Sequence, residues 1–140
     1  MDLTHGKYLG VDYGDVRTGL AECDVSGMLA SGITTIKEGG MRNTAERVAK
    51  EAAARSCKKI IIGLPKNMDG TEGERAAISR RFAELLTEET GLEVKFWDER
   101  RSSVEAHAIL HANGRKQKDH RKNVDAVAAS LMLEGYLRSL

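Results

Sequence analysis

A short apolar run between a helical pattern and a proline constrains the fold of this 140-residue chain more than any other feature. The run is Lys59–Leu64, with the sequence KIIIGL, and Pro65 stops it. Three consecutive isoleucines between a helix and a proline predict a strand that is covered on both faces. Such a strand belongs inside a sheet that has helices packed against it. The sequence therefore predicts an α/β protein.

Four further segments have the composition of strands. In chain order, the five expected strands are Lys7–Asp12, Gly19–Cys23, Gly32–Lys37, Lys59–Leu64 and Glu93–Asp98. The first three are separated by turn-like segments and indicate an antiparallel meander, whereas the last two return through helices. This arrangement predicts a mixed five-stranded sheet with helices on its faces, in a single domain spanning residues 1–140.

Helix signals complete the order β-β-β-α-β-α-β-α-α. Asn43 to Glu46 resembles a capping box and predicts the start of the first helix. Residues 74–89 carry an amphipathic pattern that ends at Gly91. A second capping box at residues 102–105 predicts a short helix that ends at Gly114, and residues 115–122 are expected to form a basic loop. Asp119 or Asn123 is expected to open the last helix, which runs to about Arg138.

Composition narrows the class of protein. The chain has no apolar run long enough to span a membrane, and its first residues lack the apolar core of a signal peptide. Cys23 and Cys57 form no C-x-x-C pattern, so they indicate neither a zinc site nor a disulfide framework. We expect a cytoplasmic protein with no membrane partner.

The formal net charge of +1 conceals an uneven distribution. Residues 100–122 contain seven basic and two acidic residues and sum to +5, which leaves −4 for the remainder. A charge run is usually a solvated face. This run lies between Glu99 and Asp125, which are considered below as metal ligands, and there it would hold a polyanion backbone. Few aromatic residues accompany it, so we expect contacts to phosphates and shape and not base stacking.

Acidic residues lie at the ends of two expected strands and on the apolar face of the last expected helix. Asp12 closes the first expected strand, and Asp98 and Glu99 close the fifth. Asp125 precedes Ala128, Ala129, Met132 and Tyr136 by 3, 4, 7 and 11 positions, so it shares their apolar face. A carboxylate turned toward a core is costly unless it caps a backbone group, pairs with an arginine or shares a cation with other acids.

The third of these possibilities points to a metal site. If the last helix packs on the sheet, then Asp12, Glu99 and Asp125 become neighbours. Carboxylates without His or Cys ligands favour a hard cation, Mg²⁺ or Mn²⁺. Such ions activate water and stabilise the leaving oxygen of a phosphodiester.

Two loops are candidates for phosphate contacts. The segment Gly10–Gly19 spaces glycines around Asp12 and Arg17, and it lacks the helix that a dinucleotide-binding fingerprint requires. The loop after Pro65 joins Lys66 and Asn67 to further glycines. Ordinary turns would also have these compositions. We expect Arg17 and Lys66 to contact phosphate.

Four segments together resemble the YqgF/RuvX family, described as Holliday junction resolvase-like proteins and as pre-16S rRNA nucleases. The segments are GVDYGDVRTGLAECD, IIGLPKNMDGTEGERA, WDER and NVDAVAAS, beginning at residues 10, 61, 97 and 123. The resemblance implies an RNase H-like fold and metal-dependent cleavage of phosphodiester bonds at the 5′ end of small-subunit ribosomal RNA.

The resemblance also implies roles for particular residues. The family's acidic site matches Asp12, Glu99 and Asp125, and Asp98 matches a position that either binds metal or orients Arg100. Substrate contacts are expected from the matching polar positions and the basic segment, at Arg17, Lys66, Asn67, Arg100, Arg101, Arg115, Lys116, Lys118 and Lys122. Arg101-Ser102-Ser103 stands where the family often has Leu-Thr-Thr, so Arg101 adds a charge beside the expected site.

Three alternatives stay open from the sequence. The same chemistry could act on branched DNA, as a Holliday junction resolvase. The chain could be a non-catalytic RNA-binding module of ribosome assembly that kept the fold. An actin-like nucleotide-binding domain has a similar first hairpin, although such proteins need two domains. The protein is expected to be a monomer or a homodimer.

Overall fold

The computed structural model describes residues 7–14, 16–23, 30–37, 39–98 and 117–139, with the backbone alone at 30, 31 and 117–124. The order of its elements is β1 (Tyr8–Asp12), β2 (Thr18–Cys23), β3 (Ala30–Ile36), α1 (Met41–Ala54), β4 (Lys59–Leu64), α2 (Glu74–Thr90), β5 (Glu93–Asp98) and α4 (Gln117–Arg138). The short helix expected between residues 102 and 114 lies outside the described residues.

The sheet is mixed, as the sequence predicts. Its five strands lie in the order β3-β2-β1-β4-β5. The first three strands pair antiparallel, and β4 joins β1 and β5 in parallel. Because β1, β4 and β5 run in the same direction, their last residues all lie at one edge of the sheet. These residues are Asp12, Leu64 and Asp98. Thr18 at the start of β2 pairs with Ile36 at the end of β3 and lies at that edge too. We call it the site edge.

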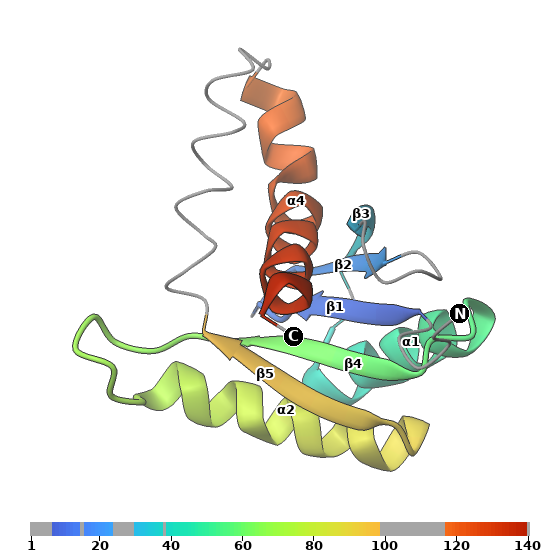
Figure 1. Ribbon diagram of the computed structural model, residues 1–140, viewed down its shortest axis with the longest axis horizontal. Coiled ribbons are helices and arrows are strands. Elements are labelled where there is room, and N and C mark those ends of the chain that lie inside the picture. The colour runs from blue at the N-terminus through green and yellow to red at the C-terminus, as the bar shows by residue number, and fades with distance from the viewer. Residues whose placement is uncertain (1–6, 15, 24–29, 38, 99–116, 140) are drawn as a thin grey trace.

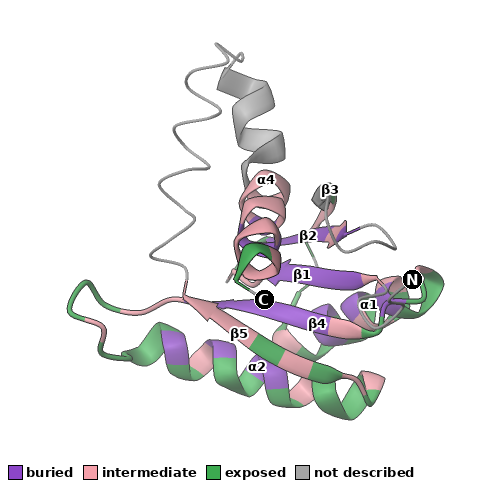
Figure 2. Ribbon diagram, viewed as in Figure 1, coloured by how far each residue is buried: buried purple, intermediate pink, exposed green. Residues whose placement is uncertain are grey.

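Helices cover both faces of the sheet, which confirms the predicted layering. Helices α1 and α2 lie on one face and α4 crosses the other (Figure 1). Ile60 and Ile62 are buried in the cluster formed with α1 and α2, whereas Ile61 is buried against Met132 and Leu133 of α4. The strand β4 is buried along almost its whole length (Figure 2). The isoleucine run is therefore covered from both sides.

The predicted start of the first helix is wrong. The helix begins at Met41, and its N-cap is Gly40 with a φ of 83°. Asn43 does not cap it: its Nδ2 donates a hydrogen bond of 2.8 Å back to the carbonyl of Gly39. The left-handed backbone of Gly40, which glycine adopts at little cost, lets the helix start before the expected cap.

The predicted start of the last helix, and the basic loop before it, also need correction. Residues 117–122 are the first turns of α4 and not a loop, so the helix is already formed before Asp119. The physical reason is that no glycine or proline occurs between residues 117 and 134, while Lys, Arg and Gln are good helix formers. These first turns project beyond the sheet (Figure 1).

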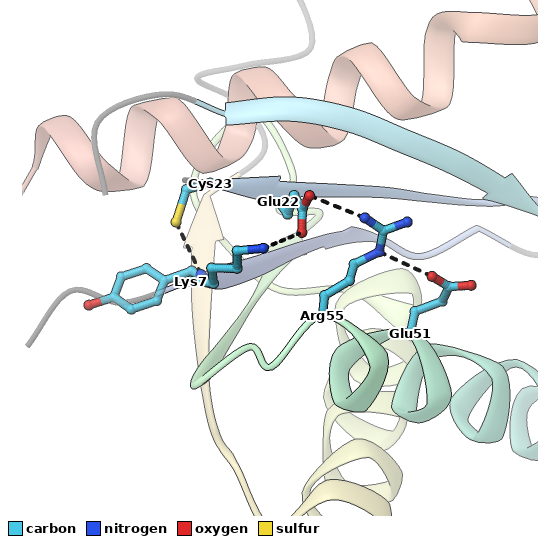
Figure 3. Close-up of polar contacts among 6 residues, drawn as sticks. Lys7, Glu22, Cys23, Glu51 and Arg55 are labelled. Carbon is cyan, nitrogen blue, oxygen red and sulfur yellow. Dashed lines mark hydrogen bonds and ion pairs between the residues drawn. The ribbon is translucent and has the colours of Figure 1, made fainter. Parts of the chain in front are cut away.

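A network of charged side chains joins β1, β2 and α1 at the edge opposite the site edge. Glu22 faces Arg55 Nη1 through Oε1 at 3.1 Å and Lys7 Nζ through Oε2 at 4.0 Å. Arg55 Nε also donates a 3.2 Å hydrogen bond to Glu51 (Figure 3). We call Lys7, Glu22, Glu51 and Arg55 the closed network. It fastens the end of α1 to the strands.

No helix among the described residues is both long and apolar enough to cross a membrane. Cys23 and Cys57 are free and buried.

Candidate active site

Three glycines allow α4 to lie directly on the sheet. A Cβ on Gly10 would lie 3.2 Å from the carbonyl oxygen of Ala129, and one on Gly32 would lie 3.1 Å from Cβ of Ala126. At Gly19 the approach is closer still, because a Cβ would lie 2.1 Å from the carbonyl oxygen of Asp125. The backbone of α4 at Asp125 therefore rests on β2 at a position that only glycine can occupy.

This contact brings Asp125 to the neighbourhood of Asp12. Gly19 is the direct cross-strand partner of Asp12 in the β1–β2 register. Alternation along β1 places Asp12 on the face of Tyr8 and Gly10, which is the face that α4 covers. Asp12 and Asp125 thus share one face at the site edge, as the sequence predicts for the two acids if the last helix packs on the sheet.

The carboxylate of Asp125 is poorly satisfied. Its side chain is 23% exposed, and Arg17 Nε lies 3.3 Å from Oδ2. Oδ2 itself is buried and accepts no hydrogen bond from any described residue, so the arginine supplies charge without a well-aligned bond. A buried carboxylate oxygen without a donor is costly. It is also what a divalent cation would coordinate, so the donor set at this position fits Mg²⁺ or Mn²⁺.

Asp98 lies on the other side of the sheet by register. Trp97 belongs to the cluster under α4, and its ring lies 2.8 Å from where a Cβ of Gly135 would be. Val94 and Phe96 pack instead with the α1–α2 cluster. Since side chains alternate, Asp98 follows Val94 and Phe96 and points away from the face of Asp12. The register argues against Asp98 and Asp12 sharing a metal.

Several predicted site residues lie outside the described residues. They are Glu99, Arg100, Arg101, Arg115 and Lys116, while Lys118 and Lys122 are described by their backbone in α4 only. Within the described ranges no group of three His, Cys, Asp or Glu side chains forms a metal site. The described part of the chain therefore supplies the pair Asp12 and Asp125, and Glu99 stays a prediction.

Backbone pairing and side-chain hydrogen bonds hold the loop after β4 in place. A β-bridge joins Lys66 to Glu72, and Asn67 Nδ2 donates a 2.9 Å hydrogen bond to Thr71 Oγ1. Two 2.7 Å hydrogen bonds from Arg80 to Glu72 anchor the loop to α2, and they lower the pKa of Glu72. The amide of Asn67 thus stabilises the loop, while Lys66 lies beside it at the site edge.

Arg75 is a candidate residue that sequence reasoning missed. With Tyr13, Pro65, Ile78 and Ser79 it lines a small pocket between the end of β1 and the first turns of α2. One signal was available in the sequence. An arginine in the first turn of a helix opposes the helix dipole and so does not stabilise the helix.

The strand order and the helices on both faces of the sheet define an RNase H-like fold. A profile of the family described as "RuvX: Holliday junction resolvase" matches residues 6–139, and the chain belongs to this family. It is 41% identical over 133 residues to a Clostridioides difficile protein named "Putative pre-16S rRNA nuclease", covering 94% of each chain. A protein of the same name from Anaeromyxobacter dehalogenans is 42% identical over 131 residues, covering 94% of this chain and 96% of the relative.

The solved structures of similar fold include two Holliday junction resolvases. The structure of Thermus thermophilus RuvC with a Holliday junction substrate matches with a TM-score of 0.62 at 14% identity, over 96% of each chain. The fowlpox virus Holliday junction resolvase matches with a TM-score of 0.57 at 15% identity, over 96% of this chain and 99% of the other. At these identities the similarity establishes the fold, which confirms the RNase H-like prediction.

Proposed function

We propose that this protein is a metal-dependent nuclease that hydrolyses phosphodiester bonds in structured RNA, acting at the 5′ end of pre-16S ribosomal RNA. The observation that carries the proposal is the contact of the Asp125 backbone with Gly19, directly across from Asp12. It brings two carboxylates from distant parts of the sequence to one face of the site edge. We place the activity in the cytoplasm, in a monomer or a homodimer.

The roles of the acids follow from their chemistry. Asp12 and Asp125 would hold Mg²⁺ or Mn²⁺, and Glu99 is the third proposed ligand. A bound cation of this kind supplies an activated water and charge stabilisation at the scissile phosphate. The chain itself fixes the positions of the two carboxylates. Asp12 is held at the end of β1, and Asp125 is held by the close packing of α4 against Gly19. Preorganised ligands avoid reorganisation when the substrate arrives.

Basic side chains around the site edge would hold the substrate. Lys66 lies on the anchored loop after β4, and Arg75 lines the adjoining pocket. The proposed contacts further along the chain are Arg100, Arg101, Arg115, Lys116, Lys118 and Lys122. Phosphate contacts position a nucleic acid without reading its sequence, so we expect weak sequence preference and a strong dependence on salt.

The choice of RNA is supported by the name shared by relatives that are about 40% identical over nearly the whole chain. A second candidate substrate is the four-way DNA junction. The description of the matching family and the junction-bound RuvC structure favour it. The two candidates share one chemistry and differ in the nucleic acid that the basic side chains accept.

The test offers the purified protein a 5′-extended 16S precursor and a four-way junction in parallel, each with Mg²⁺, Mn²⁺ or chelator. We expect cleavage of the precursor that requires metal. The variants Asp12→Asn and Asp125→Asn should lose cleavage and keep RNA binding. Cleavage of the junction alone would replace RNA by branched DNA as the substrate. Cleavage that persists in both variants would overturn the acidic site.

The same variants address the non-catalytic alternative. A ribosome-assembly module would bind the precursor without cutting it, whichever metal is present. Wild-type protein that binds but never cleaves, with a folded structure and bound Mn²⁺, would favour that alternative over a nuclease.

A further inference from the structure

Arg17 occupies an unusual place for a residue expected to contact a phosphate. It lies just before β2, and its Nε is 3.3 Å from the buried Oδ2 of Asp125. Among the described residues this is the only cation paired with that carboxylate. The proposed substrate ligand is therefore in contact with the proposed metal ligand.

We propose that Arg17 stands in for the divalent cation in the metal-free protein, and that metal binding releases it to a substrate phosphate. This inference rests on the proposed function, because it assumes that Asp125 binds metal. A guanidinium and a divalent cation that both contact one buried carboxylate oxygen repel each other strongly. The arginine and the metal consequently compete for Oδ2.

The pair has the features that an exchangeable contact needs. Oδ2 accepts no hydrogen bond in it, so the guanidinium is held by charge and not by a well-formed bond. The Arg17 side chain is 41% exposed and can move into solvent without opening the core. Ion pairs of this exposure are weak, so a divalent cation has only a small competitor to displace.

The contrast with Arg55 supports this interpretation. Arg55 donates hydrogen bonds to both Glu22 and Glu51, at 3.1 and 3.2 Å. It is fixed by two carboxylates at once and forms part of the packing of α1 on the sheet. Arg17 has neither a second carboxylate among its ion pairs in the described chain nor an aligned bond to Asp125.

The proposal couples two events at the site edge. Without metal, the positive charge of Arg17 reduces the cost of the buried Asp125 carboxylate and stabilises the docked α4. With metal, the same charge becomes available to the nucleic acid. The protein would then bind substrate phosphate more strongly once the cation is in place, beyond any contact between the cation and the substrate.

The first experiment measures Mn²⁺ affinity by titration calorimetry, without nucleic acid. Arg17→Gln should bind Mn²⁺ more tightly than wild type, by roughly two- to fivefold, which is the strength of one partly exposed ion pair. The matched control is Lys37→Gln. Lys37 is exposed and follows β3 at the site edge, so this variant removes an equal charge without touching Asp125. It should change the affinity less than Arg17→Gln does.

A second measurement follows the arginine itself. The Nε–H resonance of Arg17, identified by its loss in Arg17→Gln, should shift when Mg²⁺ is titrated into the wild-type protein. It should not shift in Asp125→Asn, which lacks the charged ligand. A resonance that stays unmoved while Mg²⁺ binds at an Asp125-dependent site would overturn the inference.

The outcomes separate this inference from the proposed function. If wild type binds no Mn²⁺, or if its Mn²⁺ binding survives in Asp125→Asn, then the metal site of the proposed function fails. If that binding exists but Arg17→Gln and Lys37→Gln alter it equally, then only the inference fails, because the effect is a long-range field and not a competition. Tighter Mn²⁺ binding in Arg17→Gln but not in Lys37→Gln supports both the proposed metal site and the inference about Arg17.

Discussion

The two edges of the sheet use their charged side chains in opposite ways. In the closed network, Glu22 faces two cations, and both of these also help to hold β1, β2 and α1 together. At the site edge, Asp125 faces Arg17 alone among the described residues, and its buried Oδ2 accepts no hydrogen bond from them. Glu22 also has a buried oxygen without a hydrogen bond, but a second cation compensates it.

We expect this difference to separate stability from the proposed function within one sheet. Charges that are matched in number and geometry contribute to folding. A carboxylate that is held by the fold but incompletely matched is a poor contributor to stability and a good ligand. Each region can be altered without the other, so substitutions can test whether the two roles are separate.

The largest expected effect comes from neutralising the two carboxylates in turn. Asp125→Asn should lower cleavage by at least about a thousandfold, or ~4 kcal/mol of transition-state stabilisation, and should leave the free energy of unfolding nearly unchanged. Glu22→Gln should do the reverse, lowering stability by about 1 kcal/mol while cleavage is retained. Single-turnover cleavage and urea unfolding measure the two quantities. A loss of cleavage in Glu22→Gln equal to that in Asp125→Asn would contradict the separation.

The next effect concerns the seating of α4. Gly19→Ala places a methyl group 2.1 Å from the backbone of Asp125, so the helix must shift, and the cost should be about 2–3 kcal/mol in unfolding free energy. Cleavage should fall with it, because Asp125 moves away from Asp12. The matched control is Gly39→Ala, where the new Cβ meets nothing within 4 Å and stability should change by less than ~0.5 kcal/mol. Equal stability of both variants would show that α4 is not seated as described.

A smaller effect is expected in the pH dependence of stability, from the buried thiol of Cys57. Burial, and next the charge of Glu22, raise the pKa of the Cys57 thiol to about 11 from an ordinary value of 9.0. The folded protein keeps this proton where the unfolded chain has lost it, so its stabilising effect is complete below pH 9 and is lost as the pH rises to about 11. The loss should approach ~2 kcal/mol. Urea unfolding of wild type and Cys57→Ala from pH 8 to 11 measures it, and parallel curves would refute the assignment.

The smallest effect is expected at Arg75. Arg75→Gln should weaken RNA binding several-fold and reduce the salt dependence of binding by about one counterion, without a change in thermal stability. Arg81→Gln is the control, because Arg81 is exposed on the same helix and does not line the pocket. Equal weakening by both variants would mean that α2 contributes only general positive charge.

The sheet could be predicted well because its strands are short and have either apolar or alternating patterns. The run Lys59–Leu64 and the alternating segment Glu93–Asp98 match the observed β4 and β5 at both ends. The start of α2 at Glu74 was predicted correctly, but the starts of α1 and α4 were not. Asn43 and Asp119 are residue types that often cap helices, but the residues before each of them are already helical. Local residue preference does not reveal this earlier start.

The candidate site was only partly accessible from the sequence. Asp12 could be found because it ends a strand, and Asp125 because it stands on an apolar stripe. The pairing of Asp125 with Arg17, the pocket lined by Arg75 and the face on which Asp98 lies depend on packing between elements that are far apart in the chain.

The class of fold and the chemical character of the site follow from the amino-acid sequence, since strand periodicity and acidic side chains are local properties. Which acid lies beside which cation depends on how α4 packs on the sheet. The reason is steric: Gly10, Gly19 and Gly32 remove the side chains that would keep α4 from the sheet. That close approach sets both the distance between Asp125 and Arg17 and the place of Asp125 beside β1.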